Sequence, residues 1–256
     1  MKLVRTVAEM RALAAPGAAL VPTMGALHAG HRSLFAAART ESPVVVASLF
    51  VNPTQFDERG DLAAYPRNEA RDAAVAEECG VDVLFAPGVE ELYRPGFATW
   101  VDVEGTGGEG AARPGHFRGV ATVCLKLFNI VRPARAYFGQ KDAQQAAVLR
   151  RMVRDLDLDL RIRVLPTVRD PDGLALSSRN VRLSPAEREQ ALALPRALHN
   201  GAASEDPVAA ARAALNGFRP DYVELVDLDG ATVLAAAVRV GSTRLIDNVL
   251  VKGELS

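Results

Sequence analysis

Continuous apolar runs alternate with longer stretches of helical spacing through the first two thirds of the chain. The runs are rich in β-branched and other apolar residues, as expected of strands that are buried on both faces of a parallel sheet. We predict such strands at 18–21, 43–51, 81–86, 134–138 and 160–165. Helices are predicted between them at 33–39, 68–79, 120–131 and 139–156. This alternation predicts an α/β fold with a doubly wound parallel sheet.

The pattern changes after about Val168. Residues 166–182 form a junction that contains a predicted turn at Asp172 and Gly173. Beyond the junction we predict two helices and two strands, at 184–198, 207–218, 221–228 and 243–251. The chain is therefore expected to contain a first domain at 1–167 and a smaller α+β domain at 168–256.

In residues 93–115 the apolar positions follow neither a helical nor a strand period. The stretch 93–100 is irregular, a short strand is predicted at 101–104, and 105–115 is the most glycine-rich part of the chain. Such a composition predicts a mobile loop, and long loops in compact domains often cover active sites. A plain linker is the alternative. The loop leads directly into His116 and the next helix, which favours a place inside the same α/β unit.

A tight turn with candidate chemistry follows the first predicted strand of the parallel sheet. Gly25 and Gly30 lack a Cβ, so a bulky ligand can approach the backbone there. His28 and His31 are three residues apart, which places both rings on one face where the helix begins. The N–H groups and dipole of a helix start favour an anion, and a phosphate chain fits such a site. A capping or packing role for the histidines is the alternative.

A second turn repeats this arrangement at residues 139–142, after the predicted strand 134–138. Lys141 stands where its charge opposes the helix dipole, and a bound anion would remove that conflict. Gln145 lies one helical turn later and shares the face of Lys141.

Polar residues also follow the predicted strand 43–51, and ligands of open α/β sheets bind beyond the carboxyl ends of the strands. Gln55 is the most suggestive of them.

Composition narrows the class of protein. The 256 residues include 30 basic and 31 acidic side chains, so no general positive field favours nucleic acid or an anionic membrane. Cys79 and Cys124 lie in predicted helices, which suits reduced thiols, and their spacing does not suggest zinc. The first residues lack the apolar core of a signal peptide, and no apolar run reaches membrane-spanning length. We therefore predict a soluble cytoplasmic protein.

Seven motifs, in this order, resemble the pantoate-beta-alanine ligase family of the nucleotidylyltransferase superfamily. They are PTMGALHAGH from Pro22, FVNPTQF from Phe50, YPR from Tyr65, RPGHFRGVATV from Arg113, YFGQKDAQQ from Tyr137, PTVRDPDGLALSSRN from Pro166 and TRLIDN from Thr243. The resemblance spans most of the chain. It implies a Rossmann-like first domain that binds ATP and pantoate, and a C-terminal domain that closes over the nucleotide.

The resemblance also implies the roles of individual residues. The residues expected to act in catalysis are His28, His31, Lys141, Ser177, Ser178 and Arg179. ATP is expected to contact these six and Pro22, Thr23, Met24, Gly25, Gly30, Gly139, Asp142, Val168 and Leu176, the last two at the adenine. Pantoate and β-alanine are expected to meet Gln55, Gln145, Asn52 and His116.

One position departs from the family pattern, which often has two consecutive acidic residues in the helix after YPR. This chain has Arg71 and Asp72 there, so Asp72 is the remaining carboxylate. We expect it to contact Mg²⁺ through water, because Mg²⁺ tends to keep several waters and to bind phosphate oxygens. The resemblance further implies a homodimer.

The implied reaction has two steps and needs no covalent attachment to the protein. Pantoate first attacks the α-phosphorus of ATP to give pantoyl adenylate and pyrophosphate, and β-alanine then displaces AMP to give pantothenate. Another small-molecule nucleotidylyltransferase is one alternative, since it would share the histidine turn and the serine-rich loop. A non-catalytic ATP-binding protein is the other.

Overall fold

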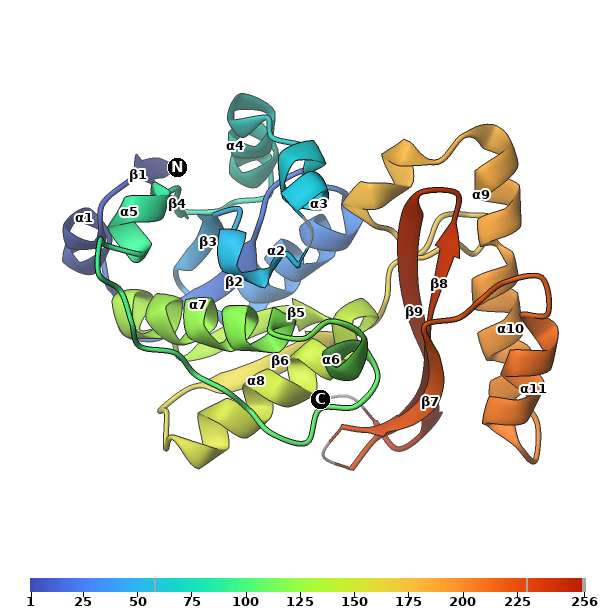
Figure 1. The fold of residues 1–256 in the computed structure, drawn as a ribbon. Coiled ribbons are helices and arrows are strands. Elements are labelled where there is room, and N and C mark those ends of the chain that lie inside the picture. Colours follow the sequence, from blue (N-terminus) through green and yellow to red (C-terminus); the bar gives the residue numbers. More distant parts are fainter. Residues whose placement is uncertain (58, 229, 255–256) are drawn as a thin grey trace.

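The computed structural model describes residues 1–57, 59–228 and 230–254. Within them, a parallel sheet of six strands forms the larger part of the molecule (Figure 1). Its order across the sheet is β1 (Lys2–Val4), β4 (Val83–Phe85), β3 (Val45–Leu49), β2 (Ala19–Thr23), β5 (Arg135–Gly139) and β6 (Arg161–Leu165). The predicted α/β class and all five predicted strands of this sheet are confirmed.

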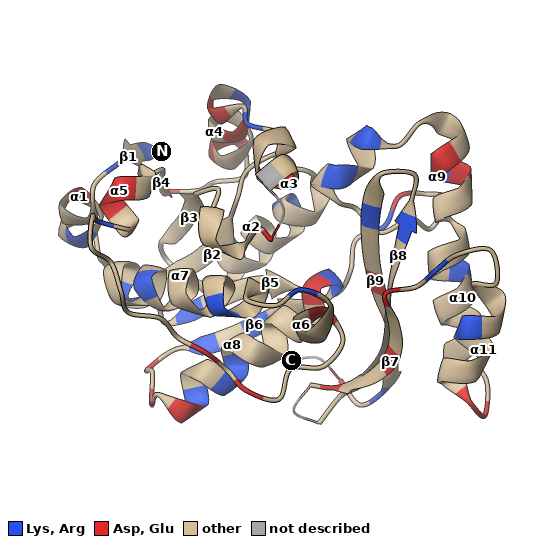
Figure 2. Cartoon of the chain, in the orientation of Figure 1, with Lys and Arg blue, Asp and Glu red and all other residues tan. Residues whose placement is uncertain are grey.

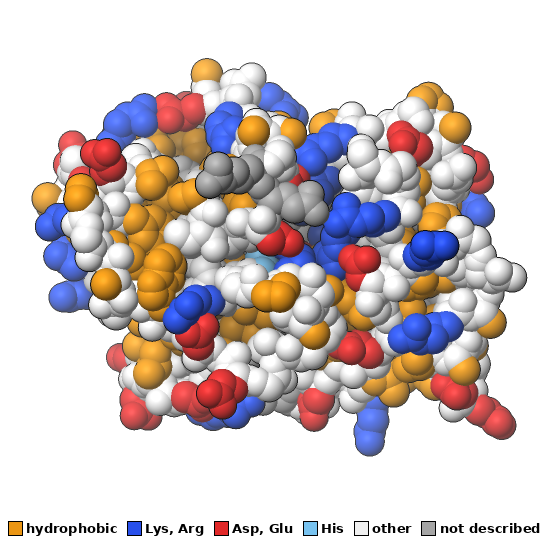
Figure 3. Space-filling model, viewed as in Figure 1, with side chains coloured by type: hydrophobic (Ala, Val, Ile, Leu, Met, Phe, Trp, Pro, Cys, Tyr) orange, Lys and Arg blue, Asp and Glu red, His pale blue; other side chains and the backbone are white. Residues whose placement is uncertain are grey.

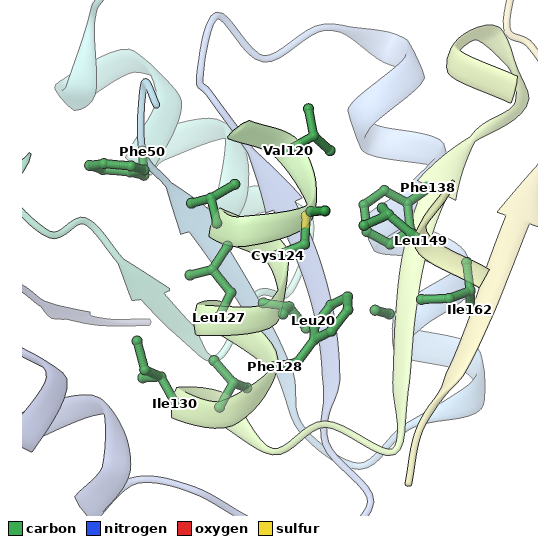
Figure 4. Packing of buried hydrophobic residues seen from close by; sticks show 14 of the residues in the cluster. Leu20, Phe50, Val120, Cys124, Leu127, Phe128, Ile130, Phe138, Leu149 and Ile162 are labelled. Carbon is green, nitrogen blue, oxygen red and sulfur yellow. The ribbon is translucent and has the colours of Figure 1, made fainter. Parts of the chain in front are cut away.

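Helices cover both faces of the sheet. One face carries α1 (Val7–Ala12), α7 (His116–Val131) and α8 (Ala143–Asp155), whose apolar side chains join Leu20 of β2 in one cluster (Figure 4). The other face carries α2 (Ala29–Glu41) and α4 (Glu69–Glu78), which pack on Val45 and Tyr137. Burial on two sides explains why these strands are apolar throughout.

The order in which the chain adds strands to the sheet reverses at β2 and β5. From β2 the chain moves outward through β3 and β4, whereas β5 and β6 extend the sheet on the other side. In open α/β sheets such a point leaves a crevice beyond the carboxyl ends of the two strands. The turns after β2 and β5 therefore meet at one place, although more than a hundred residues separate them.

The C-terminal part contains an antiparallel sheet of β7 (Tyr222–Asp227), β8 (Thr232–Val240) and β9 (Thr243–Lys252). Three helices pack on one of its faces around a second apolar cluster: α9 (Pro185–Ala191), α10 (Ala193–Ala202) and α11 (Pro207–Ala214). A smaller cluster joins β7 and β8 to Ala143 of α8. The domain boundary between residues 167 and 168 stays a prediction.

Shorter helices complete the described fold. They are α3 (Arg59–Ala64), α5 (Val89–Leu92), α6 (Glu109–Ala112) and the 3-10 helices η1 (Pro53–Gln55), η2 (Gln140–Asp142) and η3 (Ser178–Arg182). In the part of the chain that the structure describes, no helix has the length and apolar character that crossing a membrane requires.

Four local predictions need correction. Strand β8 was not predicted, because its run of alanines has low intrinsic strand preference and gains its place from burial between β7 and β9. The predicted helix 184–198 is two helices separated at Leu192. The predicted strand 101–104 is not a strand: Val101 and Val103 pack on the core that contains α7, and the Val101 N–H donates to Thr122 Oγ1. The glycine-rich stretch 105–115 contains α6, whose Glu109 is buried.

Candidate active site

A cavity of about 760 Å³ lies beyond the carboxyl ends of β2 and β5 and extends to β9. Figure 3 shows the corresponding hollow, with a histidine side chain at its floor beside basic side chains. The basic segments before α9 and on β9 lie on the side of the C-terminal part that faces the parallel sheet (Figure 2). The cavity is lined by every residue predicted for the ATP and substrate sites except Gly25.

The two early histidines cap helix α2. His28 is the N-cap residue, and its Nδ1 accepts a hydrogen bond of 3.2 Å from the Gly30 N–H. His31 Nδ1 accepts from the His28 N–H, also at 3.2 Å, which completes a reciprocal capping arrangement. Since each Nδ1 is an acceptor, each neutral ring carries its proton on Nε2. The capping and anion-binding roles are therefore compatible.

Burial keeps both imidazoles uncharged at neutral pH. Burial, and then the nearby charge of Lys141, lowers the pKa of His28 to about 4. Burial, and then His28, lowers the pKa of His31 to about 3. The ring centroids are 4.2 Å apart, so a second positive charge would be strongly opposed. The pair can donate two Nε2–H bonds without being cationic.

Asp72 does not line the cavity but lies behind the histidine turn. Its side chain is 1% exposed, and its two oxygens accept the N–H groups of Ala26 and Leu27, both at 2.8 Å. Gly25 has φ +87°, and a Cβ there would lie 2.7 Å from an Asp72 oxygen. The carboxylate is thus occupied in shaping the turn, and the geometry gives no support to the predicted contact with Mg²⁺.

The acidic residue that the family pattern has beside Asp72 is replaced by Arg71, which is exposed on α4. Among the described residues, no group of three or more His, Cys, Asp or Glu side chains could hold a metal ion. The buried carboxylate of Asp72 satisfies two backbone donors, which gives it a structural role, and its contact with Mg²⁺ through water stays a prediction.

Lys141 comes from the turn that follows β5. It lies in η2, one turn before α8, and its Nζ is 3.4 Å from Asp142 Oδ1. Burial would raise the pKa of Asp142, but the Lys141 ammonium keeps that pKa below its usual value. Asn248 of β9 holds the turn by donating to the carbonyls of Gln140 and Lys141, at 2.8 and 2.9 Å. These bonds hold the backbone of the lysine turn, and Lys141 lines the same cavity as His28 and His31.

The serine-rich loop supplies two guanidinium groups. Ser177 caps η3, and Ser178 donates to the Tyr65 hydroxyl at 3.3 Å. Arg179 and Arg182 both donate to Asp61 of α3, at 2.7 and 2.8 Å. Burial alone would raise the pKa of Asp61, and these bonds bring that pKa below its usual value. The Asp61 carboxylate thus holds the guanidinium groups of Arg179 and Arg182 side by side at the cavity wall.

Three further residues that line the cavity are not among those predicted from the sequence. Arg182 and Asn248 line the cavity, and each could have been found in part: Arg182 is three residues after Arg179, and Asn248 closes the TRLIDN motif. The sequence around Asp61 does not indicate a place in this site, because its partners Arg179 and Arg182 are 118 and 121 residues away.

Comparisons with known proteins agree with this geometry. A sequence model of the family described as pantoate-beta-alanine ligase matches residues 2–250. A pantothenate synthetase of Moorella thermoacetica is 51% identical over 280 residues, which cover 98% of this chain and 99% of that protein. The crystal structure of pantothenate synthetase from Thermus thermophilus has a TM-score of 0.94 and 49% identity, and covers 98% of this chain and 100% of that one.

A further solved structure adds a ligand-bound relative. It is a pantoate-beta-alanine ligase from Francisella tularensis complexed with beta-gamma ATP and beta-alanine, with a TM-score of 0.85 and 34% identity over 100% of both chains. The parallel sheet, the cavity at its switch point and these matches along nearly the full length agree. The chain belongs to the pantoate-beta-alanine ligase family, a family of ligases.

Proposed function

We propose that this chain joins pantoate to β-alanine in an ATP-dependent reaction that releases AMP and pyrophosphate and forms pantothenate. One observation carries the proposal. The Nε2–H groups of His28 and His31, the Lys141 ammonium and the Arg179 guanidinium line the same cavity as Gln55 and Gln145. Donors suited to a triphosphate thus lie beside amides suited to a hydroxy acid.

In the first step, a carboxylate oxygen of pantoate attacks the α-phosphorus of ATP. A bond forms between that oxygen and phosphorus, and the bond from phosphorus to the bridging oxygen of pyrophosphate breaks. Lys141, Arg179 and the two histidines stabilise the negative charge that develops on the phosphate oxygens. The neutral histidines suit this role, because they donate hydrogen bonds without titrating.

In the second step, the amine of β-alanine adds to the acyl carbon of the adenylate. The bond from that carbon to the AMP oxygen then breaks, AMP leaves with the electron pair, and the proton that the amine nitrogen loses goes to the departing phosphate. The protein contributes mainly by holding the two reactants together and away from water. We propose that residues 105–115 cover the cavity during this step, with Glu109 as their buried anchor.

Three finer points belong to the same proposal. Mg²⁺ would enter bound to the phosphates of ATP, since Asp72 is engaged by backbone N–H groups, and no step above depends on a protein-bound metal. The free cysteines Cys79 and Cys124 and the family membership support a cytoplasmic enzyme. Family membership also supports a homodimer.

The test is to supply ATP, pantoate, β-alanine and Mg²⁺ and to measure AMP and pantothenate. We expect both products in equal amounts, and pyrophosphate release only when pantoate is present. Pyrophosphate release that needs a phosphate-bearing substrate in place of pantoate would favour another nucleotidylyltransferase. ATP binding without any turnover would favour a non-catalytic protein.

A further inference from the structure

The side chain of Gln55 is oriented by a buried neighbour. Asn52, which is 1% exposed, donates from Nδ2 to Gln55 Oε1 at 3.0 Å and to the Gly119 carbonyl at 3.1 Å. Because Oε1 is engaged, the amide nitrogen of Gln55 is left to donate toward the cavity. The backbone of Thr54 and Gln55 is also in close contact with α7, since a Cβ on Gly119 would lie 2.4 Å from the Thr54 carbonyl oxygen.

The main-chain carbonyl of Gln55 accepts two further hydrogen bonds. One comes from His116 Nδ1 at 2.8 Å and the other from Arg113 Nη2 at 3.2 Å. Arg113 Nη1 also lies 3.3 Å from His116 Nε2. A guanidinium can only donate, so Nε2 must be the acceptor and the single proton of the neutral ring is on Nδ1. His116 thus has the tautomer opposite to that of His28 and His31.

Arg113 is itself held from two sides. Its Nε and Nη2 donate to Asp57 at 3.0 and 2.6 Å, and its Nη1 is 3.3 Å from Glu109. Glu109 in turn accepts two bonds of 2.8 Å from Arg244 of β9. Burial, and then the Arg113 charge, lowers the pKa of His116, which agrees with a neutral ring. A neutral His116 in this setting is a fixed donor and is poorly suited to proton transfer.

We propose that His116 and Arg113 are positioning residues that grip the main-chain carbonyl of Gln55 and so set the affinity for pantoate. His116 does this as the neutral Nδ1–H tautomer and takes no part in acid–base chemistry. The inference rests on the proposed function, because it takes Gln55 as a ligand of pantoate. The family resemblance implies only that His116 borders the substrate cavity. The inference adds that His116 acts through Gln55.

Two substitutions at His116 separate its two nitrogens. In His116→Asn the amide nitrogen is the same number of bonds from Cα as Nδ1, so the donor to Gln55 is kept. In His116→Gln the amide matches Nε2 instead, and that donor is lost. We expect His116→Gln to raise the KM for pantoate about tenfold and the KM for ATP less than about twofold. His116→Asn should raise the KM for pantoate by less than about threefold.

Arg118→Gln is the matched control on the same helix, because Arg118 is half-exposed and pairs with Asp102 outside the cavity. It should leave both KM values unchanged. A second measurement does not depend on activity: ¹⁵N NMR of the His116 ring should show the proton on Nδ1 at neutral pH.

Equal effects of His116→Asn and His116→Gln, a fall in kcat at unchanged pantoate KM, or a proton on Nε2 would each overturn the inference. A wild-type chain that forms no pantothenate would instead refute the proposed function.

Discussion

Replacing Asp72 with asparagine distinguishes a structural carboxylate from a metal-binding one. In the structure each oxygen of Asp72 accepts one backbone N–H, from Ala26 and Leu27, at 2.8 Å. Asparagine keeps one acceptor but presents an NH₂ group to the other N–H, so one buried donor loses its partner. The turn that is affected positions His28, so its catalytic function should suffer as well.

The size of the effect follows from this geometry. A hydrogen bond to a charged acceptor contributes about 1.5–3 kcal/mol net, and an unsatisfied buried donor costs about 1–3 kcal/mol. Because these contributions overlap, we expect Asp72→Asn to lower the free energy of unfolding by about 2–4 kcal/mol. At the same time kcat/KM for ATP should fall by at least about tenfold, since the histidine donors lose their fixed orientation.

Urea unfolding and steady-state kinetics at several Mg²⁺ concentrations measure both effects. Arg71→Gln is the control, because Arg71 is the exposed neighbour of Asp72 on the same helix and should leave stability and magnesium dependence unchanged. The reasoning would be refuted if Asp72→Asn kept wild-type stability and only raised the Mg²⁺ concentration needed for half-maximal activity. That outcome would favour the predicted contact of Asp72 with Mg²⁺.

Three further predictions concern ionisable side chains of the cavity. Lys141→Ala should lower kcat by about 10²-fold or more, because a fixed cation at the phosphates is lost, and near-normal turnover would remove Lys141 from the catalytic set. Asp61→Asn should lower the KM for ATP about threefold, since two arginines lose a competing anion; a higher KM would show that Asp61 mainly orients them. In the unfolded chain His28 takes up a proton below about pH 6.5, whereas in the folded chain it takes one up only near its lowered pKa of about 4. Stability should therefore fall as the pH drops from about 7 to 5, and His28→Asn, which keeps a capping acceptor, should reduce that fall in urea unfolding by about 2 kcal/mol. An unchanged pH dependence in His28→Asn would contradict the buried neutral state.

The turns after β2 and β5 were predictable because their chemistry is local. A glycine after an apolar run, followed by a histidine pair or a lysine at a helix start, indicates an anion site within about ten residues of sequence. The doubly wound pattern then implies that the two turns meet, because both follow strands at the centre of the sheet. His28, His31 and Lys141 were found in this way and line one cavity.

The remaining features depend on contacts that sequence patterns do not encode. An acidic residue at the start of α4 looks the same whether it binds a metal or two backbone N–H groups, so the role of Asp72 required the structure. The tautomer of His116 is set by Arg113, and that pairing became visible only with the positions of both side chains. Strand β8 was missed because alanine indicates neither a strand nor a core position by itself.

The clamp that Asn248 places on the Lys141 turn has a consequence for synthesis of the chain. The strands of the parallel sheet all lie within residues 2–165, so they are synthesised before Asn248. The two carbonyls of the lysine turn gain their amide partner only after residue 248 has emerged. The lysine turn is thus supported from the C-terminal part of the chain, and loss of the segment from residue 248 onward would remove the amide that holds it.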